Sequence, residues 1–179
     1  MGIAPPKTTP IFYRVSASLL TTAPAIQVIG KDSTGEVEFV LFNRDDELWV
    51  GVGSDHTDRK AEAIGVTLSK QMCPKVAGEE LWPFSEVEPH WDELILRAYA
   101  VSDGQRSLYQ EGKVSAMRHP RDLIERYGSF PPGTAMFGGT FAVIGGFRWA
   151  ETFSIELEDP RLGRRLKHSY DIRALPVEG

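Results

Sequence analysis

The sequence predicts a mainly β fold, in the form of a mixed β-sandwich roll with short helices. Three observations favour this fold class: segments in which apolar and polar residues alternate, clusters of turn-forming residues between these segments, and helical signals that cover only short stretches. Alternation is the period of a strand with one buried face, and short turns between such strands are typical of antiparallel hairpins. Strands without long helices to cover them bury their apolar faces against one another.

The expected strands combine alternation, or a short apolar run, with turn residues at their ends. They cover residues 25–29, 36–42, 48–52, 92–101, 134–138, 153–157 and 166–175, and a further return strand begins at residue 108. The turns between them cover residues 30–35, 43–46, 102–105 and 159–163. In residues 36–42 acidic and apolar side chains alternate first, which predicts a strand with one face on the core. One face of residues 92–101 carries Leu94, Leu96, Ala98 and Ala100.

Two short helices are expected. The first lies within residues 57–65 and begins at Thr57 or Asp58, because either side chain can accept hydrogen bonds from the free N–H groups of a first helical turn. The second covers residues 123–127, after an opening turn that starts at His119-Pro120. The pattern of residues 66–73 does not distinguish helix from strand, and residues 86–91 are expected to be irregular.

Length and composition indicate a single globular domain. The chain of 179 residues suits one domain, residues 11–179, after an extended Pro- and Thr-rich arm at residues 1–10. The apolar and charged fractions are 41% and 25%, which are ordinary for a globular protein. The formal net charge is −5 and most Lys and Arg residues are scattered, so no nucleic-acid partner is expected.

No membrane partner is expected either. The longest apolar stretch, residues 135–147, is too short and too rich in glycine to span a bilayer. The first ten residues lack the apolar core of a signal peptide. Cys73 is the one cysteine, which excludes an intrachain disulfide and fits a reducing compartment, so a cytoplasmic location is expected.

A dense polar segment, residues 54–60, follows the strand expected at residues 48–52. A polar cluster at the end of a buried strand is a common position for a functional site. Upstream, Glu36 and Glu38 are two residues apart on an expected strand, so their carboxylates point to the same side. We expect Glu36, Glu38 and Asp55 to converge on one divalent cation.

The chemistry of three adjacent carboxylates supports this expectation. They repel one another and raise one another's pKa unless a cation neutralises them. Ligands that are all oxygen favour a hard cation over zinc, so Mg²⁺ or Mn²⁺ is expected, with Ca²⁺ as a third candidate. Next to Asp55, His56 fits two roles equally: a structural hydrogen-bonding residue, or a general base whose pKa lies near working pH.

A series of motifs in the chain resembles the catalytic C-terminal domain of the fumarylacetoacetate hydrolase superfamily. That family carries an F-x-K-P-x-S loop, an E-x-E pair, an N-D-x-S-A-R-D segment, a lysine before a C-P turn, an N-G…Q hairpin, a P-G-D turn and a G-T-P-A-G loop. The similar segments here are Phe12 to Ser18, Glu36 to Glu38, Ser54 to Lys60, Lys70 with Cys73-Pro74, Gly104 with Gln110, Pro132 to Thr134, and Gly139 to Ala142. The resemblance extends from residue 11 to the C-terminus and is closest to a short, uncharacterised bacterial subgroup.

The resemblance implies a β-roll of the fumarylacetoacetase C-terminal-domain type, a homodimer, and Mg²⁺ or Mn²⁺ held by three carboxylates. Known members hydrolyse C–C bonds of β-diketones, decarboxylate oxaloacetate-like acids, or isomerise enol and keto diacids. A hydrolase or lyase acting on a small 2-oxo or β-dicarbonyl acid, through a metal-stabilised enolate, is therefore the expected function.

The same resemblance implies roles for individual side chains. Lys70 would stabilise developing negative charge and Arg59 would brace the site. The expected catalytic group is Lys70 and Arg59, together with His56, which is atypical of the family motif and is included because it lies next to Asp55. The expected substrate-binding group is Arg14, Ser16, Gln110, Gly139 and Thr140. Simpler roles remain open, with Lys70 facing solvent, Arg59 pairing with a neighbouring acid, and Gln110 tying its hairpin.

The chain also departs from the family pattern. Ser54 replaces an asparagine, Phe141 a proline and Arg14 a lysine, and the His-Glu dyad that many members carry near the N-terminus is not found in the sequence. These departures leave two other functions open. One is a non-catalytic module that binds a small carboxylate, and the other is a dimerisation module that retains the fold without a metal.

Overall fold

A computed structural model describes residues 9–178, and it confirms the mainly β fold class with mixed sheets and short helices. The first sheet has the order β1 (Leu20–Thr21), β7 (Lys75–Ala77), β5 (Glu47–Asp55), β4 (Val37–Arg44) and β11 (Ala135–Phe137), and β8 (Trp82–Pro83) also pairs with β5. The second has the order β10 (Gln105–Lys113), β9 (Ile95–Ser102), β12 (Thr152–Asp159), β13 (Arg164–Leu175) and β2 (Ala25–Ile29). A small third sheet joins β3 (Ser33–Thr34) to β6 (Thr57–Asp58).

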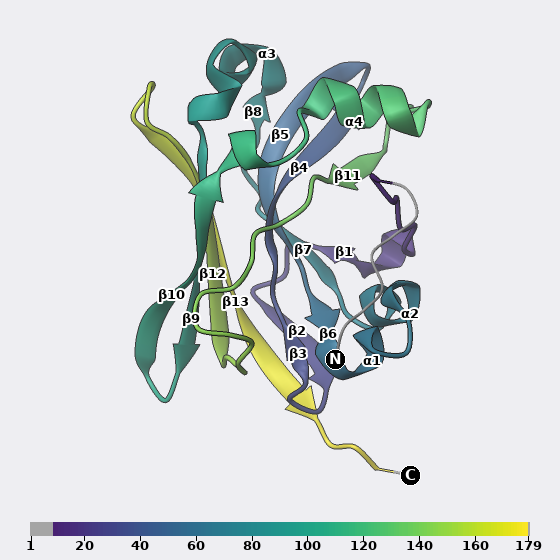
Figure 1. The fold of residues 1–179 in the computed structure, drawn as a ribbon, viewed down its shortest axis with the longest axis vertical. Helices are drawn as coiled ribbons and strands as arrows, with labels where there is room; N and C mark the ends of the chain where they lie inside the picture. Colours follow the sequence, from purple (N-terminus) through teal and green to yellow (C-terminus); the bar gives the residue numbers. More distant parts are fainter. Residues whose placement is uncertain (1–8, 179) are drawn as a thin grey trace.

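Most neighbouring strands are antiparallel, as the hairpin signals predict, but β1 with β7 and β13 with β2 are parallel pairs. The two larger sheets pack face to face, with β5 against β12 and β13, and β4 against β9. In Figure 1 the second sheet lies to the left, while α1, α2 and β1 lie to the right of β4 and β5. The predicted face of residues 92–101 is buried between the sheets, since Leu94, Leu96, Ala98 and Ala100 are at most 1% exposed.

The helices are all short. They are α1 (Arg59–Glu62), α2 (Val66–Gln71), α3 (Phe84–Val87), α4 (Pro120–Tyr127) and the 3₁₀ turns η1 (Ala17–Leu19), η2 (Glu88–Glu93) and η3 (Val114–Ala116). Asp58 is the N-cap of α1, because its carboxylate accepts a hydrogen bond from the N–H of Ala61 at 2.7 Å. Proline at the first position opens α4 three residues earlier than predicted, and Gly128, with φ of 83°, ends it.

Strand β4 differs from its prediction, because both of its faces are buried. Phe39 and Leu41 face the second sheet, as expected. Glu38 and Val40 point to the opposite face and are also buried, at 4% and 0% exposure. That face is covered by other parts of the chain, including β11, whose Phe137 ring lies close to Val40 above Gly53. Glu38, and Glu36 just before the strand, therefore line a covered cavity instead of a solvated surface.

Five strands have no counterpart in the sequence prediction, namely β1, β3, β6, β7 and β8, and each is only two or three residues long. Strands β7 and β8 are three and two residues long, so they are too short to show a period. Their pairing with β5 defines them, which is a tertiary effect. Residues 1–8 of the predicted N-terminal arm lie outside the described residues. Within residues 9–178, none of the helices is long and apolar enough to cross a membrane.

A candidate metal centre in a lined pocket

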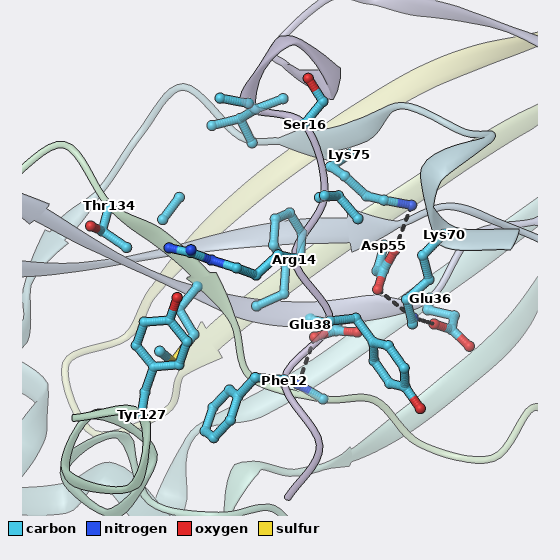
Figure 2. Close-up of a pocket in the computed structure, with 18 of the residues that line it drawn as sticks. Phe12, Arg14, Ser16, Glu36, Glu38, Asp55, Lys70, Lys75, Tyr127 and Thr134 are labelled. Atoms are coloured by element: carbon cyan, nitrogen blue, oxygen red, sulfur yellow. Dashed lines mark hydrogen bonds and ion pairs between the residues drawn. The ribbon is translucent and has the colours of Figure 1, made fainter. Parts of the chain in front are cut away.

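A pocket of about 630 Å³ lies on the covered face of β4 and β5, and Figure 2 shows its lining. Three parts of the chain enclose it: the segment before β1, the segment from α4 through β11 to the glycine loop that follows, and the ends of β4 and β5 with α2 and β7. Of the predicted site residues, seven line this pocket: Arg14, Ser16, Glu36, Glu38, Asp55, Lys70 and Thr140, together with the backbone of Gly139.

The antiparallel register of β4 and β5 brings the three predicted metal ligands together. Val37 lies opposite Ser54, and the ladder continues one step further because the N–H of Asp55 donates to the carbonyl of Glu36 at 3.0 Å. One oxygen from each of Glu36, Glu38 and Asp55 lies within 4.8 Å of the others. Among the described residues, no other group of three or more Asp, Glu, His or Cys side chains brings its ligand atoms this close together.

Glu38 is the most deeply buried of the three acids. Burial raises its pKa to about 8, the neighbouring charges of Asp55 and Glu36 act in the same direction, and Lys70 opposes them. One of its oxygens accepts a hydrogen bond from the N–H of Gly139 at 2.6 Å. Gly139 adopts φ of 103°, a conformation that glycine takes without steric cost, so the loop can present this N–H to the carboxylate.

Three cations surround the carboxylates. The ammonium of Lys70 contacts Asp55 directly and lies 3.3 Å from Glu36. The ammonium of Lys75 lies 2.7 Å from the other oxygen of Asp55 and donates to the carbonyl of His56 at 2.6 Å. On the outer side, the Arg59 guanidinium pairs with Glu36 at 2.9 Å, so Arg59 lies where it can brace this carboxylate. Arg59 does not line the pocket.

Lys75 is the site residue that the sequence analysis missed. It belongs to β7, where it lies opposite Asp55, and only 2% of it is exposed. No element was predicted for this segment, because β7 is short and forms through its pairing with β5. The sequence nevertheless contained a signal, since Lys75 is a charged residue directly between Pro74 and the apolar pair Val76-Ala77. A lysine in such a context is buried only with a partner.

The expected role of His56 as a general base does not fit the structure, because the residue lies outside the pocket and is fully buried. Its ring nitrogens lie 3.1 Å from the hydroxyl of Tyr170 and 3.0 Å from that of Ser33. Burial, together with the charges of Lys75 and Arg59, lowers its pKa to about 3. This geometry supports the structural role and not the general base. Neighbouring residues of a strand point to opposite faces, so an aspartate that faces the pocket turns the next side chain away.

The polar side-chain atoms of Gln110 and Thr140 form hydrogen bonds within the protein. Gln110 is fully buried, accepts from the N–H of Val37 at 3.0 Å, and donates to Thr140 and to the carbonyl of Phe141. The Thr140 hydroxyl in turn donates to the carbonyl of Val37 at 2.7 Å. These bonds attach the glycine loop to the start of β4. Gln110 does not line the pocket, whereas Thr140 lies in its wall.

The opposite end of the pocket carries a different charge. The Arg14 side chain points toward Tyr127 and Thr134, away from the acidic group (Figure 2). Its guanidinium lies 5.8 Å from the centre of the Tyr127 ring, and within residues 9–178 it forms no ion pair. Ser16 lies nearby on the same segment, where its N–H donates to Gln71 of α2. The pocket therefore has an acidic end with compensating lysines and a second end where Arg14 has no acidic partner in the described part of the chain.

The donor set fits a hard divalent cation. All three candidate ligands are carboxylates, and together they can supply several oxygen atoms at one point. One oxygen of Asp55 is buried and makes no hydrogen bond within the described chain, although the Lys75 ammonium lies near it. Burial is the main cause of the raised pKa of Glu38, and it disfavours the charged form of this carboxyl. A divalent cation held by the three carboxylates would favour the ionised form.

Known structures share this fold at low sequence identity. The chain is similar to 2-keto-3-deoxy-D-arabinonate dehydratase in its apo form, with a TM-score of 0.65, 16% identity, and coverage of 92% of this chain and 62% of that one. It is also similar to Cg1458, with a TM-score of 0.64, 16% identity, and coverage of 87% and 66%. The chain thus spans less than two thirds of these proteins' own length. The likeness supports the resemblance to the fumarylacetoacetate hydrolase superfamily at the level of the fold.

Sequence comparison identifies a family but no characterised relative. No curated protein matches the chain. Residues 1–170 match a family model whose description is "Protein of unknown function (DUF2848)". With nearly the whole chain inside this match, the protein belongs to the DUF2848 family.

Proposed function

We propose that this protein is an enzyme that acts on a small 2-oxo or β-dicarbonyl acid with the help of Mg²⁺ or Mn²⁺. The observation that carries the proposal is the convergence of Glu36, Glu38 and Asp55 within 4.8 Å at the end of a lined pocket. Three carboxylates at one point could together supply oxygen ligands to a divalent cation, and a pocket beside them offers room for a substrate.

The three carboxylates would hold the metal ion. When bound, such an ion supplies Lewis-acid polarisation of a carbonyl oxygen. The protein's own contribution is charge and orientation. The Lys75 ammonium is fixed by two partners and is available to stabilise negative charge that develops on a substrate oxygen near Asp55. Lys70 adds a second positive charge at the same end.

The other end of the pocket would bind the remainder of the substrate. Arg14 is a guanidinium without an acidic partner in the described chain, and it would pair with a carboxylate or another acceptor on the ligand. Thr134 lies toward the Arg14 guanidinium (Figure 2), Ser16 also lines the pocket, and both could add hydroxyl hydrogen bonds. The side chains of Phe12, Met136 and Phe137 form apolar walls that limit the access of water.

The reaction type is the open part of the proposal. C–C hydrolysis, decarboxylation and tautomerisation of a 2-oxo acid all require stabilisation of negative charge next to a carbonyl group. The dehydratase among the similar structures adds loss of water from a 2-keto-3-deoxy acid to these candidates. The predicted homodimer and the predicted cytoplasmic location belong to the same proposal and remain predictions.

A non-catalytic carboxylate-binding module is the second candidate, and one observation favours it. No histidine lines the pocket within residues 9–178, and His56 is bound elsewhere, so an obvious proton-transfer group is missing. A metal-bound ligand could then be held without turnover.

Assays of turnover with and without metal separate the two candidates. Purified protein is incubated with oxaloacetate, an acylpyruvate and 2-keto-3-deoxyarabinonate, in Mn²⁺ or in EDTA, and each substrate is followed by its absorbance or by chromatography. We expect turnover of one substrate in Mn²⁺, its loss in EDTA, and its loss in Asp55→Asn. The matched control is Asp92→Asn, an exposed residue away from the pocket, which should keep full activity. Binding without turnover of any substrate would favour the second candidate.

A further inference from the structure

Lys70 lies at the position that a shared metal ion would need. Its ammonium contacts one oxygen of Asp55 and lies 3.3 Å from an oxygen of Glu36, so it bridges two of the three candidate ligands (Figure 2). Both oxygens would have to turn toward the metal ion in a common coordination sphere. A lysine ammonium and a divalent cation cannot share these oxygens at short range without strong repulsion.

The two lysines of the site are held in different ways. Lys75 has a side chain that is 3% exposed, and its ammonium is anchored by the His56 carbonyl and by Asp55. Lys70 projects from the last turn of α2 and has a side chain that is 16% exposed. Within residues 9–178 its hydrogen bonds go only to the two carboxylates. Lys70 can therefore leave toward the pocket without breaking a bond to the backbone, whereas Lys75 cannot.

The net charge of the acidic group and its cations gives a second reason for Lys70 to move when a metal ion binds. Glu36, Glu38 and Asp55, when ionised, carry three negative charges, and Arg59, Lys70 and Lys75 carry three positive charges. The group is then balanced without any metal. Adding a divalent cation to the intact group would leave two excess positive charges in a largely buried space, which is unfavourable. Movement of the most exposed and least anchored cation relieves part of this excess.

We infer that Lys70 is a tethered competitor of the divalent cation, which occupies Glu36 and Asp55 in the metal-free protein and leaves them when the metal binds. This inference rests on the proposed function, because it assumes that the three carboxylates are the metal ligands. It adds a property of this chain's own residues: the affinity of the site for metal is set by how readily Lys70 moves away. The displaced ammonium remains at the pocket, where an anionic substrate can accept a hydrogen bond from it.

The first test measures Mn²⁺ affinity by isothermal titration calorimetry, without substrate, for the wild type and for Lys70→Met. Removal of the competing ammonium should tighten Mn²⁺ binding by at least about tenfold, because adjacent like charges are strongly unfavourable. The matched control is Lys60→Met, an exposed lysine on α1 that lies outside the pocket, and its affinity should equal that of the wild type. Lys70→Gln, which keeps a polar side chain, is measured in parallel and should behave like Lys70→Met.

A second measurement follows thermal unfolding of the same variants in EDTA and in saturating Mn²⁺. In EDTA, Lys70→Met should unfold at a lower temperature than the wild type, because the carboxylates lose a counterion. In Mn²⁺ it should gain more than the wild type does, since tighter binding to the folded state gives greater stabilisation.

The outcomes separate this inference from the proposed function. If the wild type binds Mn²⁺ and Lys70→Met binds it equally or more weakly, the inference is overturned while the metal site stands. A gain of the same size in Lys60→Met would also overturn it, because the effect would then come from net charge alone. If neither the wild type nor either Lys70 variant binds Mn²⁺ at millimolar concentration, the inference and the metal-dependent function are both wrong.

Discussion

Two groups of three acidic side chains in this molecule are alike in composition. They differ in the cations that contact them and in the direction in which a pKa is shifted. The first is the pocket group Glu36, Glu38 and Asp55. The second is an outer group on the far face of the second sheet, where Glu111, Glu156 and Glu158 surround Arg97. In the outer group one guanidinium contacts all three carboxylates, and Arg165 adds a further ion pair to Glu158 at 3.0 Å.

The pKa directions summarise the difference. In the outer group, hydrogen bonds from Arg97 and then from Arg165 lower the pKa of Glu158. In the pocket group, burial raises the pKa of Glu38 to about 8 despite the nearby Lys70. Clustered acids therefore do not by themselves mark a functional site. Acids that are buried together and have a pKa raised by that burial are better candidates, because strongly perturbed pKa values concentrate at functional sites.

The largest expected effect comes from removing the most deeply buried cation. Lys75→Met leaves an oxygen of Asp55 and the His56 carbonyl without their partner, so the free energy of unfolding should fall by about 3–5 kcal/mol, as for other broken buried pairs. Arg97→Met in the outer group should cost about 1 kcal/mol or less, because Glu111 and Glu158 are partly exposed and can turn to solvent. Urea denaturation of both variants in EDTA measures the difference. Equal losses would mean that the pocket group is no more buried in solution than the outer one.

The next effect concerns metal affinity. Glu38→Gln removes one candidate ligand, and we expect Mn²⁺ binding to weaken by at least about 10–100-fold, the range found when even supporting residues around a metal are lost. Glu156→Gln, the corresponding change in the outer group, should leave the affinity unchanged. Calorimetric titration of both variants provides the comparison. Unchanged affinity in Glu38→Gln would remove this residue from the ligand set.

The smallest effect is a difference in the pH dependence of stability. Glu38 has a raised pKa, so the folded metal-free protein binds more protons than the unfolded chain between pH 4.5 and about 8, and stability should fall as the pH rises through this range. One proton contributes at most about 1.4 kcal/mol per pH unit. Glu158 has a lowered pKa, so its contribution is present above pH 4.5 and is lost as the pH falls below that value.

Urea denaturation in EDTA at a series of pH values measures both contributions. Glu38→Gln should flatten the slope between pH 5 and 8, and Glu158→Gln should change it only in the acidic range. The same dependence in both variants would show that the two groups share one environment.

Much of the fold could be predicted because hairpins are encoded locally. Residues 92–101 alternate, a turn follows, and the structure has strand β9 with the predicted buried face. The short strands β7 and β8 could not be predicted, since pairing with β5 and not an internal pattern defines them. For the same reason Lys75 was missed, although it is the lysine most firmly fixed at the site.

The candidate site was predictable in part. Two acids spaced by one residue on a strand point to the same side, and this local rule placed Glu36 and Glu38 together. The same rule, applied to Asp55 and His56, turns the histidine away from the pocket, yet adjacency in sequence favoured it as a base. Burial of its ring against Tyr170 and Ser33 is a contact between distant segments, and no pattern near residue 56 encodes it.

The sequence by itself determined the strand and turn order, the net charge, the single cysteine and the side on which the first two acids lie, because each of these depends on neighbouring residues. Tertiary structure alone decided how far the acids are buried, which cations contact them, and that Arg14 lies at the other end of the pocket. These features depend on strand register and on which distant segments cover β4. Pairing and burial of this kind are energies between residues far apart in the chain, and no local period records them.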